Sequence, residues 1–333
     1  MDAIAKQHSC IKNRNAANKL GMKPHITSGE SKFSLFMRGL KRDKYLLLLI
    51  LPGFLYYIIF RYIPMTGIII GFKDYNAYRG IWASPWNNFQ HFKDFFGDIM
   101  FLRLFRNTLL LGLYSILWGF PAPIIFALLL NEVKNTKFKR TVQTISYMPH
   151  FISTVIIVGM ILSFLSPTTG IVNRIITAMG GDPIHFMVKS EWFRTIYISS
   201  GIWQGTGWGA IIYLAAISNI NEELYEAARI DGAKRFKQAI YITLPSITPT
   251  IVILFILNVG GILDNDFQKV LLMQNAAIYE TADVIQTYVY RRGIISADFS
   301  FATAVDISRS IIALGLVSLT NFISSKVSDV SLW

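Results

Sequence analysis

Aromatic and amide side chains stand close together in one apolar stretch of the sequence, and their types and spacing suit the binding of a sugar. Trp203, Gln204 and Trp208 lie among glycines. Aromatic faces stack on the C–H surfaces of sugars, amides hydrogen-bond to hydroxyl groups, and residues four apart share one face of a helix. The glycines equally favour close contact between helices, with Gln204 as a hydrogen-bonding group between them. A substrate path and a packing seam are therefore both open.

Three more polar side chains interrupt apolar stretches nearer the C-terminus: Asn258, Asp306 and Arg309. Asn258 carries an amide that is expected to face protein rather than lipid. Asp306 and Arg309 are three residues apart, so they can neutralise each other on one helix face. An uncompensated charge in mid-bilayer costs about 2.5–3.5 kcal/mol. We expect either a pair that faces a partner subunit or charges that face a water-filled substrate path.

Motifs for other kinds of chemistry are missing from the sequence. No stretch has the GxxxxGK[ST] pattern of a nucleotide-binding loop. The five histidines show no metal-ligand spacing, and Cys10 is the only cysteine. No paired carboxylates or Ser/His/Asp arrangement stands out. We expect no catalytic residue, no metal and no cofactor bound by this chain.

The elements that must position these residues are membrane-spanning helices. The chain of 333 residues is 53% hydrophobic and 16% charged, whereas soluble proteins carry about 25% charged residues. Its apolar stretches reach about 18 residues or more, which is long enough to cross a bilayer core of about 30 Å. We predict an all-α membrane protein with six transmembrane helices, roughly Tyr45–Tyr62, Thr108–Leu130, Phe151–Leu165, Ile196–Ile217, Ile247–Leu263 and Phe301–Ile323.

The distribution of basic residues predicts the orientation. Ten Lys and Arg residues precede the first apolar stretch, and a cytoplasmic N-terminus places 19 of the 32 inside against 11 outside. This asymmetry agrees with the positive-inside rule and puts both termini in the cytoplasm. The basic tail has no interleaved aromatics that could stack on bases. The net charge of +12 therefore indicates membrane orientation and not nucleic-acid binding.

Three regions follow from these assignments. Residues 1–44 form the basic cytoplasmic tail, residues 45–106 hold the first transmembrane helix and an outer aromatic segment, and residues 107–333 form the core with the cytoplasmic loop 219–249. The outer segment is either an interfacial aromatic belt or a docking surface for a soluble partner. Its aromatic residues are Tyr75, Tyr78, Trp82, Trp86, Phe89, Phe92, Phe95 and Phe96.

The loop 219–249 differs from the rest of the chain because charges of both signs alternate along it. Asn219 or Asn221 can cap a helix whose first turn is acidic, as the helix dipole favours. Gly232 then breaks this helix through a backbone conformation that other residues resist. A second helix, about Ala233–Tyr241, leads to Leu244-Pro245, where the chain is expected to end or kink before it re-enters the membrane. The sequence predicts an elbow of two helices at the cytoplasmic face.

The elbow resembles the EAA loop of binding-protein-dependent ABC permeases. The resemblance lies in an EAA triplet, a glycine six residues after its glutamate, and a later Leu-Pro. The matching residues are Glu226, Ala227, Ala228, Asp231, Gly232, Ala233, Phe236, Ile242, Leu244, Pro245 and Pro249. It implies the type I ABC importer permease fold, with the loop as the coupling helix seated in a separate ATPase. ATP and Mg²⁺ would then be bound by that partner chain.

Residues beyond the elbow resemble the carbohydrate-uptake branch of the same family. They include Asn107-Thr108 and Met148-Pro149. Residues 279–285 and 288–291 are in addition similar to a subgroup assigned to oligosaccharides, aldouronate-type acidic ones among them. The resemblance implies a bacterial cell-membrane complex with a second permease subunit as heterodimer partner, an ATP-binding subunit dimer and an extracytoplasmic solute-binding protein.

The sequence departs from the family pattern in two places. Asn221 stands where proline is common, and Asp306 and Arg309 charge a helix that is usually neutral there. The second departure bears on whether the substrate is acidic. A permease for a peptide or polyamine is the alternative within the family. An ATP-independent secondary carrier is the alternative outside it, but it would require internal inverted repeats.

Overall fold

The structure, a computed structural model, describes residues 43–327 and residue 331. The predicted basic tail of residues 1–44 therefore lies almost entirely outside the described residues. The chain divides into two units, one that ends at Thr66 and one that begins at Gly67. All regular structure in the described residues is helical, apart from an isolated bridge between Lys73 and Trp86. This confirms the predicted all-α class.

The described part of the first unit is one long apolar helix with changes of pitch. It comprises α3 (Lys44–Tyr57), the π-helical η1 (Ile58–Tyr62) and α4 (Ile63–Met65), and continues into the 3-10 segment η2 (Thr66–Phe72). The predicted end at Tyr62 was therefore too early. Its most apolar 18-residue window has a mean hydropathy of 2.0, so this helix is apolar enough to cross a membrane.

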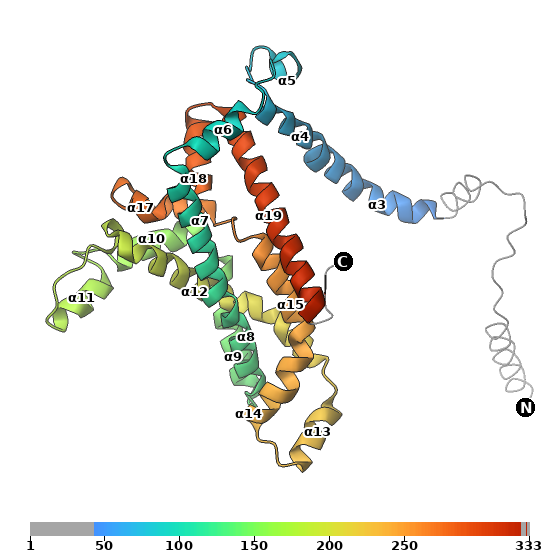
Figure 1. Cartoon of the computed structure of the whole chain (residues 1–333). Helices are drawn as coiled ribbons and strands as arrows, with labels where there is room; N and C mark the ends of the chain where they lie inside the picture. The colour runs from blue at the N-terminus through green and yellow to red at the C-terminus, as the bar shows by residue number, and fades with distance from the viewer. Residues whose placement is uncertain (1–42, 328–330, 332–333) are drawn as a thin grey trace, which may run out of the picture. The chain divides into compact units, whose positions relative to one another are not determined.

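The second unit contains the remaining helices (Figure 1). Their bounds are α5 (Gly80–Ala83), α6 (Gln90–Gly97), α7 (Phe101–Tyr114), η3 (Ser115–Gly119), α8 (Pro121–Asn131), α9 (Thr136–Tyr147), η4 (Met148–Phe151), α10 (Thr154–Phe164), α11 (Ile171–Ala178), η5 (Phe186–Val188), α12 (Ser190–Ser218), α13 (Glu222–Ile230), α14 (Arg235–Gln238), η6 (Ala239–Thr243), α15 (Leu244–Gly260), α16 (Phe267–Met273), η7 (Ala276–Ile278), α17 (Tyr279–Ala282), α18 (Ile285–Val289), η8 (Tyr290–Ile295) and α19 (Phe299–Val327).

π-helical turns carry three of the long helices past prolines. η1, η3 and η6 each end two residues before a proline: Pro64, Pro121 and Pro245. Proline lacks an N–H donor and its ring collides with the carbonyl four residues earlier, and a π turn shifts the bonding to i→i+5 at that point. The chain was expected to end or kink at Leu244-Pro245; the helix does not end there, because it continues from Arg235 to Gly260.

Four helices in the described residues are long and apolar enough to cross a membrane: Lys44–Phe72, Phe101–Asn131, Arg235–Gly260 and Phe299–Lys326. The predicted third span, Phe151–Leu165, corresponds to the second helix of a bent pair. The two helices of this pair, Thr136–Phe151 and Thr154–Phe164, meet at 99°. Pro149 and the N-cap Ser153, which accepts a bond from Ile156 N, separate the two halves. α12 has 29 residues, but its Gly, Ser, Thr and Gln residues lower its hydropathy. Six spans thus remain a prediction.

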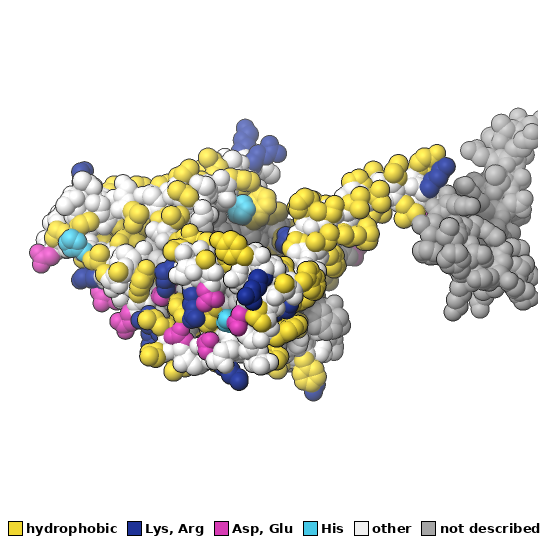
Figure 2. Space-filling view, turned by 90° about the horizontal axis from the view of Figure 1, so that it is seen from above, with side chains coloured by type: hydrophobic (Ala, Val, Ile, Leu, Met, Phe, Trp, Pro, Cys, Tyr) yellow, Lys and Arg dark blue, Asp and Glu magenta, His cyan; other side chains and the backbone are white. Residues whose placement is uncertain are grey.

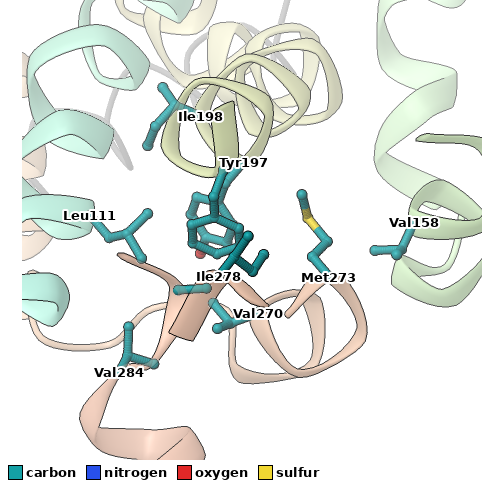
Figure 3. Close-up of a cluster of buried hydrophobic side chains, with 10 residues drawn as sticks. Leu111, Val158, Tyr197, Ile198, Val270, Met273, Ile278 and Val284 are labelled. Atoms are coloured by element: carbon teal, nitrogen blue, oxygen red, sulfur yellow. The ribbon is translucent and has the colours of Figure 1, made fainter. Parts of the chain in front are cut away.

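The functional elements of the second unit lie at opposite ends (Figure 1). α13 and α14 form one end, and α6, α17 and α18 lie toward the other. A buried cluster joins α7, α10 and α12 to the loop of α16 and α17; Figure 3 shows Leu111, Tyr197, Val270 and Ile278 converging in it. Because this loop contributes completely buried side chains, it forms part of the core.

Candidate functional site

The elbow at α13 is built by two local stop signals. Asn221 caps the helix by accepting a hydrogen bond from Glu223 N at 3.1 Å, so the cap is Asn221 and not Asn219. At the other end Gly232 has φ +75°. Gly232 N donates to Arg229 O and Ala233 N donates to Ala228 O, which is the Schellman pattern that a left-handed residue closes. The predicted break at Gly232 is confirmed.

Two contacts hold the elbow against the membrane helices. The Tyr225 hydroxyl lies 2.9 Å from Thr243 Oγ1, and Thr243 is buried in η6. Arg235 donates to the Glu132 carbonyl at 3.3 Å, and its Nε lies 3.9 Å from the Glu132 carboxylate at the end of α8. A groove of about 710 Å³ runs between these elements and includes Tyr225, Glu226 and Lys234 in its lining.

The outward surface of the elbow combines charged residues with large, uncovered apolar side chains. Ile230 is 87% exposed, Phe236 77% and Leu224 50%. Glu226, Ala227, Asp231 and Gly232 are exposed, whereas Ala228 and Ala233 are half-buried. Leu244 is half-buried and Pro245 exposed, within the helix that follows. A short charged helix that displays large apolar side chains is typical of a surface that another protein covers.

Gln204 and Trp208 of α12 both contact the bend between α9 and α10. Gln204 Nε2 donates to Ile152 O at 3.4 Å. The Trp208 ring stacks on His150, with centroids 4.5 Å apart and planes at 1°. Between them, Gly207 approaches Ser146 so closely that a Cβ would lie 2.0 Å from Ser146 O. One turn of α12 therefore packs closely against the bend between α9 and α10.

The other predicted path residues lie at separate cavities. Trp203 lines an apolar cavity of about 360 Å³ between α10 and α12. Asn258 donates to Leu254 O within its own helix at 2.8 Å and lines a cavity of about 380 Å³. Asp306 and Arg309 line the largest of these, of about 650 Å³, with walls from Tyr75, Phe267, Tyr290 and Phe299. The structure does not bring the six residues to one place.

Arg309 has a second acidic partner that the sequence spacing does not reveal. Its guanidinium forms an ion pair with Asp264, in the loop after α15, while its Nε lies 3.5 Å from Asp306 Oδ1. Arg309 is thus shared between two carboxylates. The expected pair of Asp306 and Arg309 is present, and Asp264 is an additional partner of Arg309.

A buried polar network in the loop between α15 and α19 was missed by residue-by-residue analysis. Asp283 is 1% exposed. It accepts two hydrogen bonds from Arg291, at 2.6 and 2.8 Å, and one from Thr287. Asn107 Nδ2 donates to the carbonyls of Glu280 and Asp283. The network ties the loop to α7, and the resemblance of residues 279–291 to a subgroup was the only signal for it.

Lys269 is a second missed residue. It is 3% exposed, its Nζ donates to Tyr197 O at 3.0 Å, and it lies 4.7 Å from the centre of the Tyr197 ring. Burial lowers the pKa of Lys269 to about 8, although the nearby Asp266 carboxylate opposes the shift. Tyr197 also accepts a bond from Asp266 N, so both ends of α16's first turn are tied to α12.

Comparison with known proteins identifies close relatives. Residues 119–325 match the family described as "Binding-protein-dependent transport system inner membrane component". LplB of Bacillus subtilis is 44% identical over 93% of this chain and 97% of its own length. The "Polygalacturonan/rhamnogalacturonan transport system permease protein YteP" of the same organism is 43% identical over 88% and 91%. A chain in the crystal structure of a bacterial alginate ABC transporter, in complex with an alginate pentasaccharide-bound periplasmic protein, is 42% identical, with TM-score 0.82 over 89% of this chain and 99% of that one.

Proposed function

The chain belongs to the family of binding-protein-dependent transport system inner membrane components, and we propose that it forms the translocation path of an ATP-driven oligosaccharide importer. The family is one of multi-pass permease subunits, so the chain is not an enzyme. The proposal for the substrate rests on relatives. One is named for polygalacturonan and rhamnogalacturonan, and a solved relative imports the acidic polysaccharide alginate.

The observation that carries the ATP-driven part is the exposed elbow. α13 is capped at both ends and tied to η6 through Tyr225, and Arg235 of α14 ties the elbow to the end of α8. Ile230 and Phe236 are nevertheless exposed. We propose that a partner ATPase covers this surface and holds ATP and Mg²⁺. Force on α13 would then pass through Tyr225 and Thr243 to the helix Arg235–Gly260. The coupling residues are Glu226, Ala227, Ala228, Asp231, Gly232, Ala233, Leu244 and Pro245.

The remaining parts of the assembly follow from the same proposal. A second permease subunit completes the path, an ATPase dimer drives it, and an extracytoplasmic solute-binding protein delivers the oligosaccharide. The chain crosses the membrane six times, with α12 and the bent pair of α9 and α10 as the two less apolar spans. Both termini are then cytoplasmic, and α13 is on the cytoplasmic side.

Trp203, Gln204, Trp208, Asn258, Asp306 and Arg309 are proposed to contribute to the substrate path. Their cavities open on different helices, so the path would be completed by the second permease. The contact of Gln204 and Trp208 with the α9–α10 bend supports a role for these two in the movement of the path. Asp306 and Arg309 lie beside an aromatic-walled cavity, which suits a sugar ring.

The proposal is tested by ATP hydrolysis in the reconstituted complex. The wild-type chain, with its second permease, ATPase and loaded binding protein in proteoliposomes, is expected to show oligosaccharide-stimulated hydrolysis. Gly232→Pro and Glu226→Lys are expected to insert and assemble but to lose the stimulation. Normal stimulation in both variants would contradict the coupling role of the elbow. Asp182→Lys, a charge reversal at an exposed position between α11 and η5, serves as the control for the change of charge.

A further inference from the structure

We propose that the cavity beside Arg194 binds the carboxylate of an acidic sugar residue, an inference that rests on the proposed function. The cavity has a volume of about 440 Å³ and lies between α7–η3 and the first turns of α12. Tyr114 and Trp118 line one side of it, and Glu191, Arg194 and Thr195 line the other. Cavities of this size are typical of small-ligand sites.

Arg194 lacks an acidic partner. Within residues 43–327, no carboxylate lies within 4.0 Å of its guanidinium. Its hydrogen bond goes to a neutral amide, from Nη2 to Asn107 Oδ1 at 3.1 Å, and its Nε is buried without a partner. A half-buried guanidinium without an ion pair is poorly solvated, so an incoming carboxylate would gain a charge-assisted hydrogen bond from its terminal nitrogens.

Other half-buried arginines of the second unit are already neutralised. Arg291 binds both oxygens of Asp283, and Arg309 is shared between Asp264 and Asp306. At the Arg309 cavity the guanidinium is therefore already bound by carboxylates, whereas the Arg194 guanidinium is not. This contrast selects Arg194 for the binding of an anionic group. The proposed site is therefore distinct from the Asp306 and Arg309 pair that the sequence pattern indicated.

Asn107 positions Arg194. Its side chain is completely buried, and its Nδ2 is held by the carbonyls of Glu280 and Asp283 at 2.8 and 3.0 Å. This fixes the amide so that Oδ1 faces the guanidinium. The loop network thus holds the Arg194 side chain at the cavity through Asn107.

The other lining groups match the rest of a uronic acid residue. Tyr114 is 37% and Trp118 62% exposed, so aromatic faces are available for the C–H surface of a sugar ring. The Glu191 carboxylate, three residues before Arg194 on α12, can accept hydrogen bonds from ring hydroxyls. Nearby Arg106 and Glu280 carry opposite charges and offset each other. In the proposed topology the cavity lies at the outer end of α12, where an entering oligosaccharide arrives first.

The test compares an acidic with a neutral sugar in the complete reconstituted transporter. The probes are trigalacturonate and its carboxyl-reduced trisaccharide, and uptake is expressed per assembled complex. Arg194→Gln is expected to lower the ratio of acidic to neutral uptake about tenfold, because a charge-assisted hydrogen bond of about 1.4 kcal/mol is lost. Arg194→Lys keeps the positive charge but loses the planar guanidinium with its paired donors, and it is expected to retain an intermediate ratio. If the wild-type complex imports only the acidic trimer, the uptake rate of this trimer by Arg194→Gln is compared with that by the control variant.

Arg174→Gln is the matched control, because Arg174 is an exposed cation of α11 outside this cavity. It is expected to leave the ratio unchanged, which excludes a general effect of surface charge. An unchanged ratio in Arg194→Gln would overturn the inference. Loss of complex assembly in Arg194→Gln would also overturn it, since Arg194 would then pair with the second permease. Failure of the wild-type complex to import either trimer would instead contradict the proposed function.

Discussion

The Tyr225 hydroxyl lies 2.9 Å from Thr243 Oγ1 and joins the elbow helix α13 to the π turn η6 near the start of the long helix Arg235–Gly260. Thr243 Oγ1 also lies 3.4 Å from Gln238 O. Thr243 is 1% exposed. The contact therefore connects an exposed segment to a buried position of a helix that enters the membrane.

Tyr225→Phe is expected to weaken coupling without preventing assembly. The substitution removes a hydrogen bond with a net value of about 1 kcal/mol, so oligosaccharide-stimulated ATP hydrolysis should fall several-fold at equal complex content. Tyr241→Phe is the control, because Tyr241 is 74% exposed on the helix that carries Thr243. Equal stimulation in the two variants would show that the Tyr225–Thr243 contact carries no coupling.

Substitutions at Gly232 should rank by their tolerance of a left-handed backbone. φ is +75°, and an added Cβ would meet no atom within 4 Å, so backbone strain alone decides the effect. A non-glycine residue there costs about 1–2 kcal/mol, and asparagine costs less. Stimulated hydrolysis is expected to fall in the order Gly232, Gly232→Asn, Gly232→Ala, Gly232→Val. A variant order that follows side-chain size but not asparagine's preference would point to a steric contact with the ATPase.

The elbow could be predicted from sequence because its signals are local. A capping asparagine, acidic first-turn residues and a glycine stop act within a few residues of one another, and the structure places each where the pattern indicated. Whether the helix ends or kinks at Leu244-Pro245 could not be decided in the same way. Proline normally ends a helix, but a π turn in the preceding five residues accommodates it here.

The charged groups were harder to predict because their partners are distant in sequence. Asp306 was expected beside Arg309 from spacing alone, whereas Asp264 is 45 residues away. Arg194 belongs to no motif in the sequence, and nothing local marks Asn107, 87 residues earlier, as its partner. Helical periodicity identifies which residues share a face but not which loop closes over them.

Cysteines at positions 137 and 234 are expected to react from the cytoplasm, and those at 93 and 189 from outside. The 19-to-11 division of basic residues and the positive-inside rule support this orientation. The measurement is labelling with a membrane-impermeant maleimide in a Cys10→Ser background, before and after the membrane is opened. Labelling of position 234 from outside would place the elbow on the outer side of the membrane, where ATP is not available, and would contradict the predicted orientation.

Lys269 is expected to make stability depend on pH between about 8 and 10. Its pKa is lowered in the folded state to about 8 from an ordinary value of 10.5, so in this range the unfolded chain binds more protons and stability rises with pH, by up to about 1.4 kcal/mol per unit. Below pH 8 the cost of the buried charge is constant. The melting temperature of wild type relative to Lys269→Met should therefore rise from pH 8 to pH 10. A constant difference would show that Lys269 is not buried as a charged group.

Gln204→Leu and Trp208→Ala distinguish a substrate path from a packing seam. Both side chains contact the α9–α10 bend, through Ile152 O and the His150 ring, while the close approach at Gly207 holds the helices together without them. We expect each variant to reduce sugar uptake much more than basal ATP hydrolysis or assembly, because the bend keeps its backbone contact with α12. Gly207→Ala is the reference for a damaged seam, since its Cβ would collide with Ser146 O, and it should lose assembly first. If Gln204→Leu and Trp208→Ala behave like Gly207→Ala, and the surviving complexes transport at the normal rate, these side chains pack helices and do not line the path.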